Sequence, residues 1–131
     1  MKELQVIQGT PKWLAERAKY FAASEAPVMM GASKKMGRNE LLRLKSTGNE
    51  REYSDWVQRN LFDKGHAFEA LARIIVEGNI GEELYPVTAT DDDGWLLASM
   101  DGMTMLGTVL FEHKMWNPEL AATVCAGELD P

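Results

Sequence analysis

Two short runs decide how the C-terminal half of the chain folds: Leu96-Leu97-Ala98-Ser99-Met100-Asp101-Gly102 and Thr108-Val109-Leu110-Phe111-Glu112-His113-Lys114. A turn near Met105-Leu106-Gly107 separates them. We therefore expect two strands, about residues 95–101 and 107–115, that pair as a hairpin. Because side chains alternate along a strand, Glu112 and Lys114 would share one face, and the pairing can bring Asp101 beside Glu112.

The polar residues of this hairpin have the chemistry of a site for a hard divalent cation. The carboxylates of Asp101 and Glu112 and the backbone carbonyl of His113 are oxygen ligands of the kind that Mg²⁺ prefers. Lys114 can orient or deprotonate an attacking water and offset developing charge, as hydrolysis of a phosphodiester requires. The alternative is a polar hairpin edge with a Glu–Lys surface pair. Many chains contain such a spacing by chance, so the pattern alone leaves both interpretations open.

A carboxylate on a predicted upstream helix adds to this chemistry. Glu69 shares one helix face with four apolar or small residues, Phe62, Gly65, Ala72 and Val76. A carboxylate on such a face is costly unless it is paired or binds a cation. Glu69 is therefore either a further metal ligand or the partner of Arg73 in an i,i+4 ion pair, which contributes about 0.2–0.5 kcal/mol. His66 fits a helix-edge residue better than a ligand, because it has no partner at zinc-site spacing.

The remaining segments predict helices before the hairpin and one helix after it. Thr10 and Ser24 are expected N-caps, with a proline in the first turn of each helix. Glycines are expected to end the helices. In chain order we expect helices over 10–18, 24–31, 39–47 and 55–78, the last closed by Gly78, then an edge strand over 84–88, the hairpin, and a helix over 119–126. Helices followed by a β-meander indicate a single α+β, or mixed α/β, domain over residues 1–131.

Composition excludes several classes of protein. The 131 residues suffice for one core, and the single cysteine excludes a disulfide framework. No apolar run approaches the roughly 18–20 residues of a membrane span, and no secretion signal is visible, so we expect a cytoplasmic protein without a membrane partner. The net charge of −6 is unevenly distributed: residues 12–59 hold ten Lys/Arg against six Asp/Glu, whereas residues 60–131 hold three against thirteen. This asymmetry suits a protein that binds phosphates with one part and cations with another, or it reflects ordinary variation along a solvated surface.

Taken in order, five segments resemble the YqaJ-like viral recombinase family, the phage exonucleases related to the lambda alkaline exonuclease. They are Gln8-Gly9-Thr10-Pro11-Lys12-Trp13-Leu14-x-x-Arg17, Ala23-Ser24-Glu25-Ala26, Gly65-His66-x-x-Glu69-x-x-Ala72, Ser99-Met100-Asp101-Gly102 and Glu112-His113-Lys114. The resemblance implies a PD-(D/E)XK nuclease with a restriction-endonuclease-like core, in which N-terminal helices pack on a short mixed sheet. It also implies a Mg²⁺ cofactor, with Mn²⁺ as a substitute, and resection of linear duplex DNA from 5′-phosphorylated ends. A homo-oligomer and a single-strand annealing protein as partner are implied as well.

Residue roles follow from the resemblance position by position. Asp101, Glu112 and the carbonyl of His113 would hold the metal together with Glu69, and Lys114 would be the catalytic lysine. A pocket for the 5′ phosphate would contain Arg17, Ser24 and Ser99. Arginine offers a bidentate fork and a serine at a helix start can join backbone N–H groups, although Ser24 also fits a plain helix cap. Lys34, Lys35 and Arg38 are candidate contacts to the DNA backbone, or a solvated basic loop.

Two departures from the family pattern leave alternatives open. Family members continue past the position of Pro131 into a further helix and strands, so we expect this chain to lack that C-terminal portion and to expose a sheet edge. A further phosphate-pocket arginine is not evident after Lys114. The competing hypotheses are a catalytically impaired remnant that binds DNA or a recombination partner, and an endonuclease of the same fold.

Overall fold

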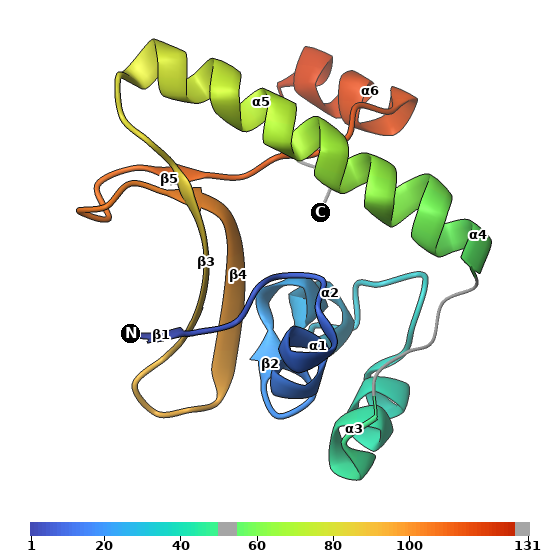
Figure 1. Cartoon of the computed structure of the whole chain (residues 1–131). Coiled ribbons are helices and arrows are strands. Elements are labelled where there is room, and N and C mark those ends of the chain that lie inside the picture. The colour runs from blue at the N-terminus through green and yellow to red at the C-terminus, as the bar shows by residue number, and fades with distance from the viewer. Residues whose placement is uncertain (50–54, 128–131) are drawn as a thin grey trace.

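The computed structural model describes residues 1–49 and 55–127, which form a mixed α+β fold built on one open, mostly antiparallel sheet (Figure 1). The strands run in the order β1-β3-β4-β2, and β5 also pairs with β4. The bounds of the strands are β1 Lys2–Leu4, β2 Phe21–Ala22, β3 Tyr85–Thr90, β4 Leu96–Met103 and β5 Leu110–Phe111. The helices are α1 Pro11–Arg17, the 3-10 helix η1 Ala23–Glu25, α2 Ala26–Met29, α3 Arg38–Thr47, α4 Asp55–Val57, the π-helix η2 Gln58–Asp63, α5 Lys64–Ile80 and α6 Pro118–Ala126.

The antiparallel pair β3–β4 is the centre of the sheet. Thr88 lies opposite Ser99, and Ala89 opposite Ala98. Ser99 lies two residues before Asp101 on β4, and the register with β3 shifts by one residue between Met100 and Met103. Thr88 is buried, and its hydroxyl makes a 3.2 Å hydrogen bond with that of Ser99, which satisfies both polar groups. This part of β4 carries residues of the candidate site.

The expected strand over 84–88 is present as β3, and it lies at an edge only over its first part. It pairs with β4 on one side, and on the other side β1 pairs only with Thr88–Thr90. Pro86 precedes the residues paired with β1 and falls where the β3–β4 register shifts, between Tyr85 and Val87. The missing N–H of the proline therefore removes no regular ladder hydrogen bond.

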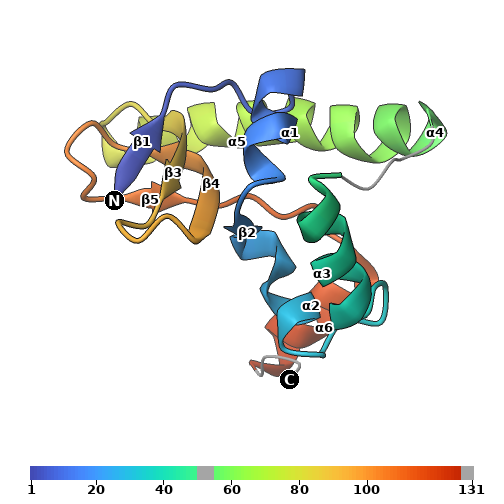
Figure 2. The ribbon, with the colours of Figure 1, turned by 90° about the horizontal axis from the view of Figure 1, so that it is seen from below.

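Two N-terminal strands complete the sheet, and neither was expected from the sequence. Strand β1 is antiparallel to β3, and β2 is parallel to β4, so the sheet is mixed. Viewed from below, the first segment of the chain runs past the sheet into α1, and β2 then leads to η1 and α2 (Figure 2). These pairings hold α1 beside β4.

Most helix boundaries follow local capping chemistry, as expected. The Thr10 hydroxyl accepts from the Trp13 N–H at 3.3 Å at the start of α1. Helix α6 begins after Asn117, whose side chain accepts from the Leu120 N–H. Gly48 and Gly127 end α3 and α6 in the left-handed conformation. Ser24 is not an N-cap, because it lies inside η1 and its hydroxyl accepts from Arg17 instead.

The long helix ends later than expected. The segment from α4 through α5 is helical from Asp55 to Ile80, with the π-helical turn η2 in between. Gly78 lies inside α5, and Gly81, at φ +73°, ends it. A glycine inside a helix costs about 1 kcal/mol relative to alanine, which the packing of a 17-residue helix can tolerate.

Strand β5 is much shorter than the predicted strand over 107–115. It pairs Leu110 with Met103 and Phe111 with Gly102, and the chain then leaves the sheet. A Cβ placed on Gly102 would lie 3.0 Å from the Leu84 Cβ and 3.3 Å from the Phe111 Cβ. The bare glycine thus permits the close approach that sets β5 against β4.

Within the described part of the chain, no helix is both long and apolar enough to cross a lipid bilayer.

Candidate active site

Asp101 lies near the end of β4 and binds the segment that leaves β5. Its Oδ2 accepts a 2.7 Å hydrogen bond from the backbone N–H of His113. The β4–β5 register, continued by one residue beyond Phe111, sets Asp101 opposite Glu112. The expected proximity of the two hairpin segments is therefore confirmed, but the contact to Asp101 comes from the backbone of His113.

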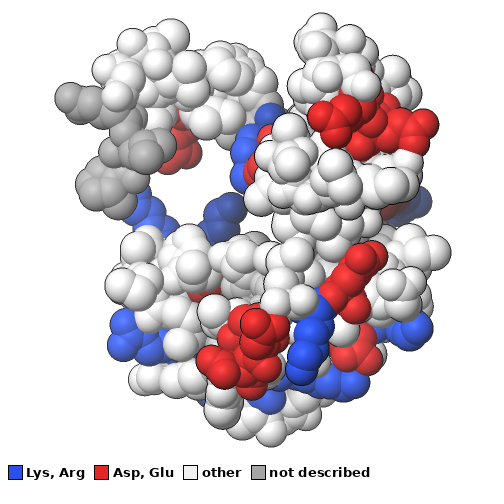
Figure 3. Space-filling view, turned by 90° about the vertical axis from the view of Figure 1, so that its left-hand side faces the viewer, with Lys and Arg blue, Asp and Glu red and all other residues white. Residues whose placement is uncertain are grey.

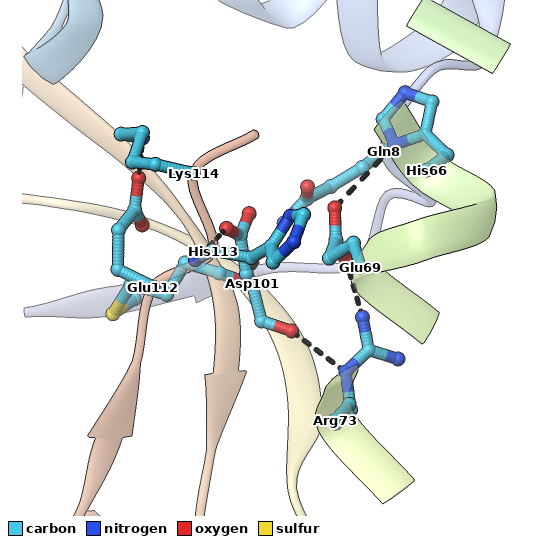
Figure 4. A network of polar contacts seen from close by, with 9 residues as sticks. Gln8, His66, Glu69, Arg73, Asp101, Glu112, His113 and Lys114 are labelled. Atoms are coloured by element: carbon cyan, nitrogen blue, oxygen red, sulfur yellow. Dashed lines mark hydrogen bonds and ion pairs between the residues drawn. The ribbon is translucent and has the colours of Figure 1, made fainter. Parts of the chain in front are cut away.

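Glu69 faces Asp101 from α5 and is joined to it through Arg73 (Figure 4). Arg73 Nη2 donates to Glu69 Oε1, and Arg73 Nε donates to the Asp101 carbonyl at 2.9 Å. The side chains of Glu69 and Arg73 are 13% and 18% exposed. His66 Nδ1 lies 3.5 Å from the other Glu69 oxygen, with its ring largely in solvent. Of the two expectations for Glu69, the structure shows the ion pair with Arg73.

Glu112 and Lys114 follow β5 and pair with each other. Lys114 Nζ donates to Glu112 Oε1, and both side chains are more than half exposed. In Figure 4 this pair points away from the group formed by Glu69 and Arg73. Glu112 and Lys114 lie on the same side of the chain, as expected. Their pairing at the surface is what the alternative interpretation, a polar hairpin edge with a Glu–Lys pair, predicts.

The predicted metal ligands have suitable donor atoms but are not gathered into a cluster. All the donors are oxygens, as Mg²⁺ prefers. Yet within residues 1–49 and 55–127 no three His, Cys, Asp or Glu side chains come close enough together to hold a metal ion. Glu69 is engaged by Arg73, Asp101 by the His113 N–H and Glu112 by Lys114. These contacts would have to rearrange before the three carboxylates could share one ion.

The residues predicted to bind phosphate meet around Trp13, one turn into α1. Arg17 Nη2 donates to the Ser24 hydroxyl at 3.2 Å, and the Arg17 guanidinium stacks 4.9 Å above the Trp13 ring. The Trp13 Nε1–H donates to the Ser99 hydroxyl at 2.9 Å. Arg17, Ser24 and Ser99 thus come from α1, η1 and β4 to one place, with the Trp13 indole between Arg17 and Ser99.

An acidic residue and a lysine that the sequence did not single out also lie here. Glu25 is 2.9 Å from Lys45 Nζ and 3.7 Å from Arg17 Nη2. Glu25 Oε2 also accepts from the Ala22 N–H, and Lys45 donates to the Arg17 carbonyl. The side chains of Glu25 and Lys45 are nearly buried. Their spacing in sequence predicts no contact, since α3 brings Lys45 to η1 only in the folded chain.

An open cavity of about 1270 Å³ lies beside this group, lined by Arg17, Ser24, Glu25, Lys35, Lys45 and His66 among others. Within the described residues Arg17 Nε is buried and has no hydrogen-bond partner. A buried donor without an acceptor costs about 1–3 kcal/mol, so Arg17 would gain a hydrogen bond if its side chain turned toward an anion in the cavity. The lining of the cavity combines cationic side chains with one carboxylate, that of Glu25.

The expected basic loop is only partly available to a ligand. Lys35 lines the cavity and Lys34 is exposed, whereas Arg38 begins α3 and its Nε donates to the Met29 carbonyl. On the face shown in Figure 3, Lys/Arg and Asp/Glu side chains lie interspersed over the lower part of the molecule. That face shows no separation into a basic patch and an acidic patch.

No protein-family model and no curated protein sequence matches the chain significantly. The likeness to YqaJ-like recombinases therefore stays a prediction from the motifs.

Proposed function

We propose that this protein is a metal-dependent nuclease of the PD-(D/E)XK type that acts on ends of double-stranded DNA. The observation that supports it best is the spacing of two residues on β4. Ser99, which contacts the Trp13 indole, and Asp101, which contacts His113 and Arg73, lie two residues apart on this strand. That spacing is roughly 6–7 Å, close to the distance between successive phosphates of a strand. A terminal phosphate beside Ser99 would leave the next phosphodiester beside Asp101.

Phosphate binding is the part of the proposal that the largest number of contacts supports. Arg17 has a fork of donors, of which Nη2 binds the Ser24 hydroxyl and Nε has no acceptor among the described residues. If the side chain turned toward the cavity, a phosphate oxygen would satisfy Nε by a charge-assisted hydrogen bond. Glu25 lies close to both Arg17 and Lys45 and partly neutralises them, so a bound phosphate would compete with this carboxylate for the two cations.

Cleavage would depend on the carboxylates that are predicted to bind the metal. Glu69, Asp101, Glu112 and the His113 carbonyl are the groups that would hold Mg²⁺, or Mn²⁺ in its place. The ion would supply charge neutralisation and a more acidic water. Arg73 and Lys114 now neutralise Glu69 and Glu112, and both cations would be free to stabilise the phosphodiester once these carboxylates turn to the metal. The product strand would pass to a single-strand annealing protein.

A second candidate function is binding of DNA ends without cleavage. It is favoured by the pairing of Glu69 and Glu112 with cations of the chain itself. In this arrangement Glu69 and Glu112 need no metal to offset their charge. The cationic side chains around the cavity, Arg17 among them, would still bind phosphate.

One digestion assay separates these functions. Linear duplex with or without a 5′ phosphate, and covalently closed circles, are incubated with Mg²⁺ or with chelator. An exonuclease digests linear DNA only with Mg²⁺, prefers the phosphorylated end and leaves circles intact, whereas an endonuclease also cuts circles. Lys114→Ala should abolish digestion, while Lys19→Ala, at an exposed lysine that pairs with Glu16, should not.

Binding to the same DNA is measured in parallel. Salt-sensitive binding that survives Glu112→Gln, without digestion, supports the second function. Neither digestion nor binding at low salt would refute both.

A further inference from the structure

Helix α5 is turned with its charged residues toward the sheet and its apolar residues outward. Between Ala67 and Ile80 the charged residues are Glu69, Arg73 and Glu77. They repeat every four residues on one face, and none of the three is fully exposed. Arg73 binds Glu69 and the Asp101 carbonyl, and Glu77 Oε1 accepts from the Leu84 N–H at 2.8 Å. The polar face of α5 is thus used inside the molecule.

The opposite face of α5 is apolar and open. Phe68, Leu71, Ile74 and Ile75 are 51–66% exposed. Residues 68, 71, 75 and 78 follow the alternating spacing of three and four that forms a seam between packed helices. Ala67, Ala70 and Gly78 leave room for a close backbone approach. Figure 1 shows α5 along the outside of the fold, and Figure 2 shows α6 away from it.

This apolar face is comparable in size to the largest apolar patch on a typical monomer, and such a patch is often functional. The four large side chains expose on the order of 500 Å² of apolar area, at the upper end of the largest patch on a typical monomer. If two such faces met, together they would bury on the order of 1,000 Å², which is the size at which an interface becomes specific. The chain carries a net charge of −6, but this face has no acidic side chain, and its one charged residue is Lys64 at the first residue of the helix.

The two ends of α5 set the direction of such a pairing. Lys64 is exposed at the first residue of the helix, and the exposed Glu82 and Glu83 follow its end. An antiparallel pair places Lys64 of each copy near the acidic end of the other. A parallel pair would bring like charges together at both ends.

We propose that the outer face of α5 is an isologous interface, across which two copies of this chain pack their α5 helices antiparallel about a two-fold axis. The axis lies near the middle of the helix, so Leu71 of one copy meets the same region of the other. The interface does not involve the carboxylates of the candidate site, and its test reads molecular mass, so it stands or fails independently of the nuclease proposal.

The experiment measures mass by analytical ultracentrifugation from about 1 to 100 µM. The full chain is expected to be dimeric at the upper concentrations. Leu71→Glu and Leu71→Lys should each raise the dissociation constant by about 100-fold, because a charge is buried opposite its own kind. An equimolar mixture of the two variants should recover the dimer as a heterodimer. Leu106→Glu, at an 82% exposed residue in the β4–β5 turn, is the matched control and should leave the dimer intact.

Since Leu71 is exposed, circular dichroism should show both variants folded like the wild type. A monomeric wild-type chain at 100 µM, a dimer that tolerates Leu71→Glu, or a mixture that stays monomeric would overturn the proposal. Equal dissociation by Leu106→Glu would place the interface elsewhere and would also overturn it.

Discussion

Replacing Arg73 by methionine removes the cation that links α5 to β4 while keeping most of the side-chain volume. Arg73 gives one charge-assisted hydrogen bond to Glu69 and another to the Asp101 carbonyl. Such bonds contribute about 1.5–3 kcal/mol each when they are shielded, whereas an exposed ion pair contributes about 0–1 kcal/mol. Because both side chains of the pair are less than one-fifth exposed, we expect the free energy of unfolding to fall by about 2–3 kcal/mol.

A double-mutant cycle isolates the contribution of the pair. Urea unfolding is followed by circular dichroism for the wild type, Arg73→Met, Glu69→Gln and the double variant. The coupling energy should be about 1–2 kcal/mol, because Glu69→Gln should lower the free energy of unfolding only slightly once Arg73 has been replaced. Lys64→Met, on the exposed end of the same helix, should change the free energy of unfolding by less than about 0.5 kcal/mol. A coupling energy below about 0.5 kcal/mol would refute the ion pair between Glu69 and Arg73.

The same variant tests whether Glu69 serves a metal. If Arg73 and Mg²⁺ compete for this carboxylate, Arg73→Met should tighten Mg²⁺ binding about tenfold, measured by titration calorimetry. Unchanged affinity, in a variant that is folded at the temperature of the titration, would contradict the role of Glu69 as a ligand.

Three further predictions concern single contacts, and urea unfolding measures each. The backbone N–H groups at the start of β4 hold the pKa of Asp91 below its usual range. The stabilisation by this carboxylate is therefore present above about pH 4 and lost as pH falls through the lowered pKa. Asp91→Ala should be less stable than wild type at pH 7, and this difference should shrink as the pH falls; a difference that stays constant into acid would contradict this. Gly102→Ala should lower the free energy of unfolding by about 1–3 kcal/mol through overpacking. Gly65→Ala, with open space around its Cβ, should leave this free energy unchanged or raise it by up to about 1 kcal/mol. Equal effects of the two substitutions would refute the close approach of β5 to β4. Trp13→Phe should cost about 1 kcal/mol by removing the hydrogen bond to Ser99, and a further loss is expected when Ser99→Ala is added, because the buried Thr88 hydroxyl then also loses its partner.

Local chemistry determines the parts of the fold that the sequence could predict. The starts of α1 and α6 and the ends of α3 and α6 depend on caps within a few residues, such as Thr10 and Gly48. The end of α5 was predicted wrongly because Gly78 and Gly81 are both suitable stops, and it is Gly81 that takes the left-handed conformation and ends the helix. Strands β1 and β2 have three and two residues, too few for a period to be visible.

The candidate site shows the same division between local and distant contacts. Pairing of Glu69 with Arg73, and of Glu112 with Lys114, follows from helix and strand spacing and was among the expectations. The contact of His113 with Asp101 depends on where β5 leaves the sheet, and that depends on Gly102. Trp13, Lys45 and Glu25 were not predicted as members of the site, since their neighbours come from other segments.

The sheet order has a consequence for how the protein folds. Lys2 pairs with Thr90 and Phe21 pairs with Leu96. Strands β1 and β2 therefore cannot pair until β3 and β4, which lie much later in the chain, have been synthesised. Closing such long loops is slow, and high contact order predicts a folding time of milliseconds to seconds rather than microseconds. During synthesis the N-terminal segment that carries Arg17 must remain without its sheet until β4 has left the ribosome. Helix α5 can form first, with its apolar face available before the rest of the fold is complete.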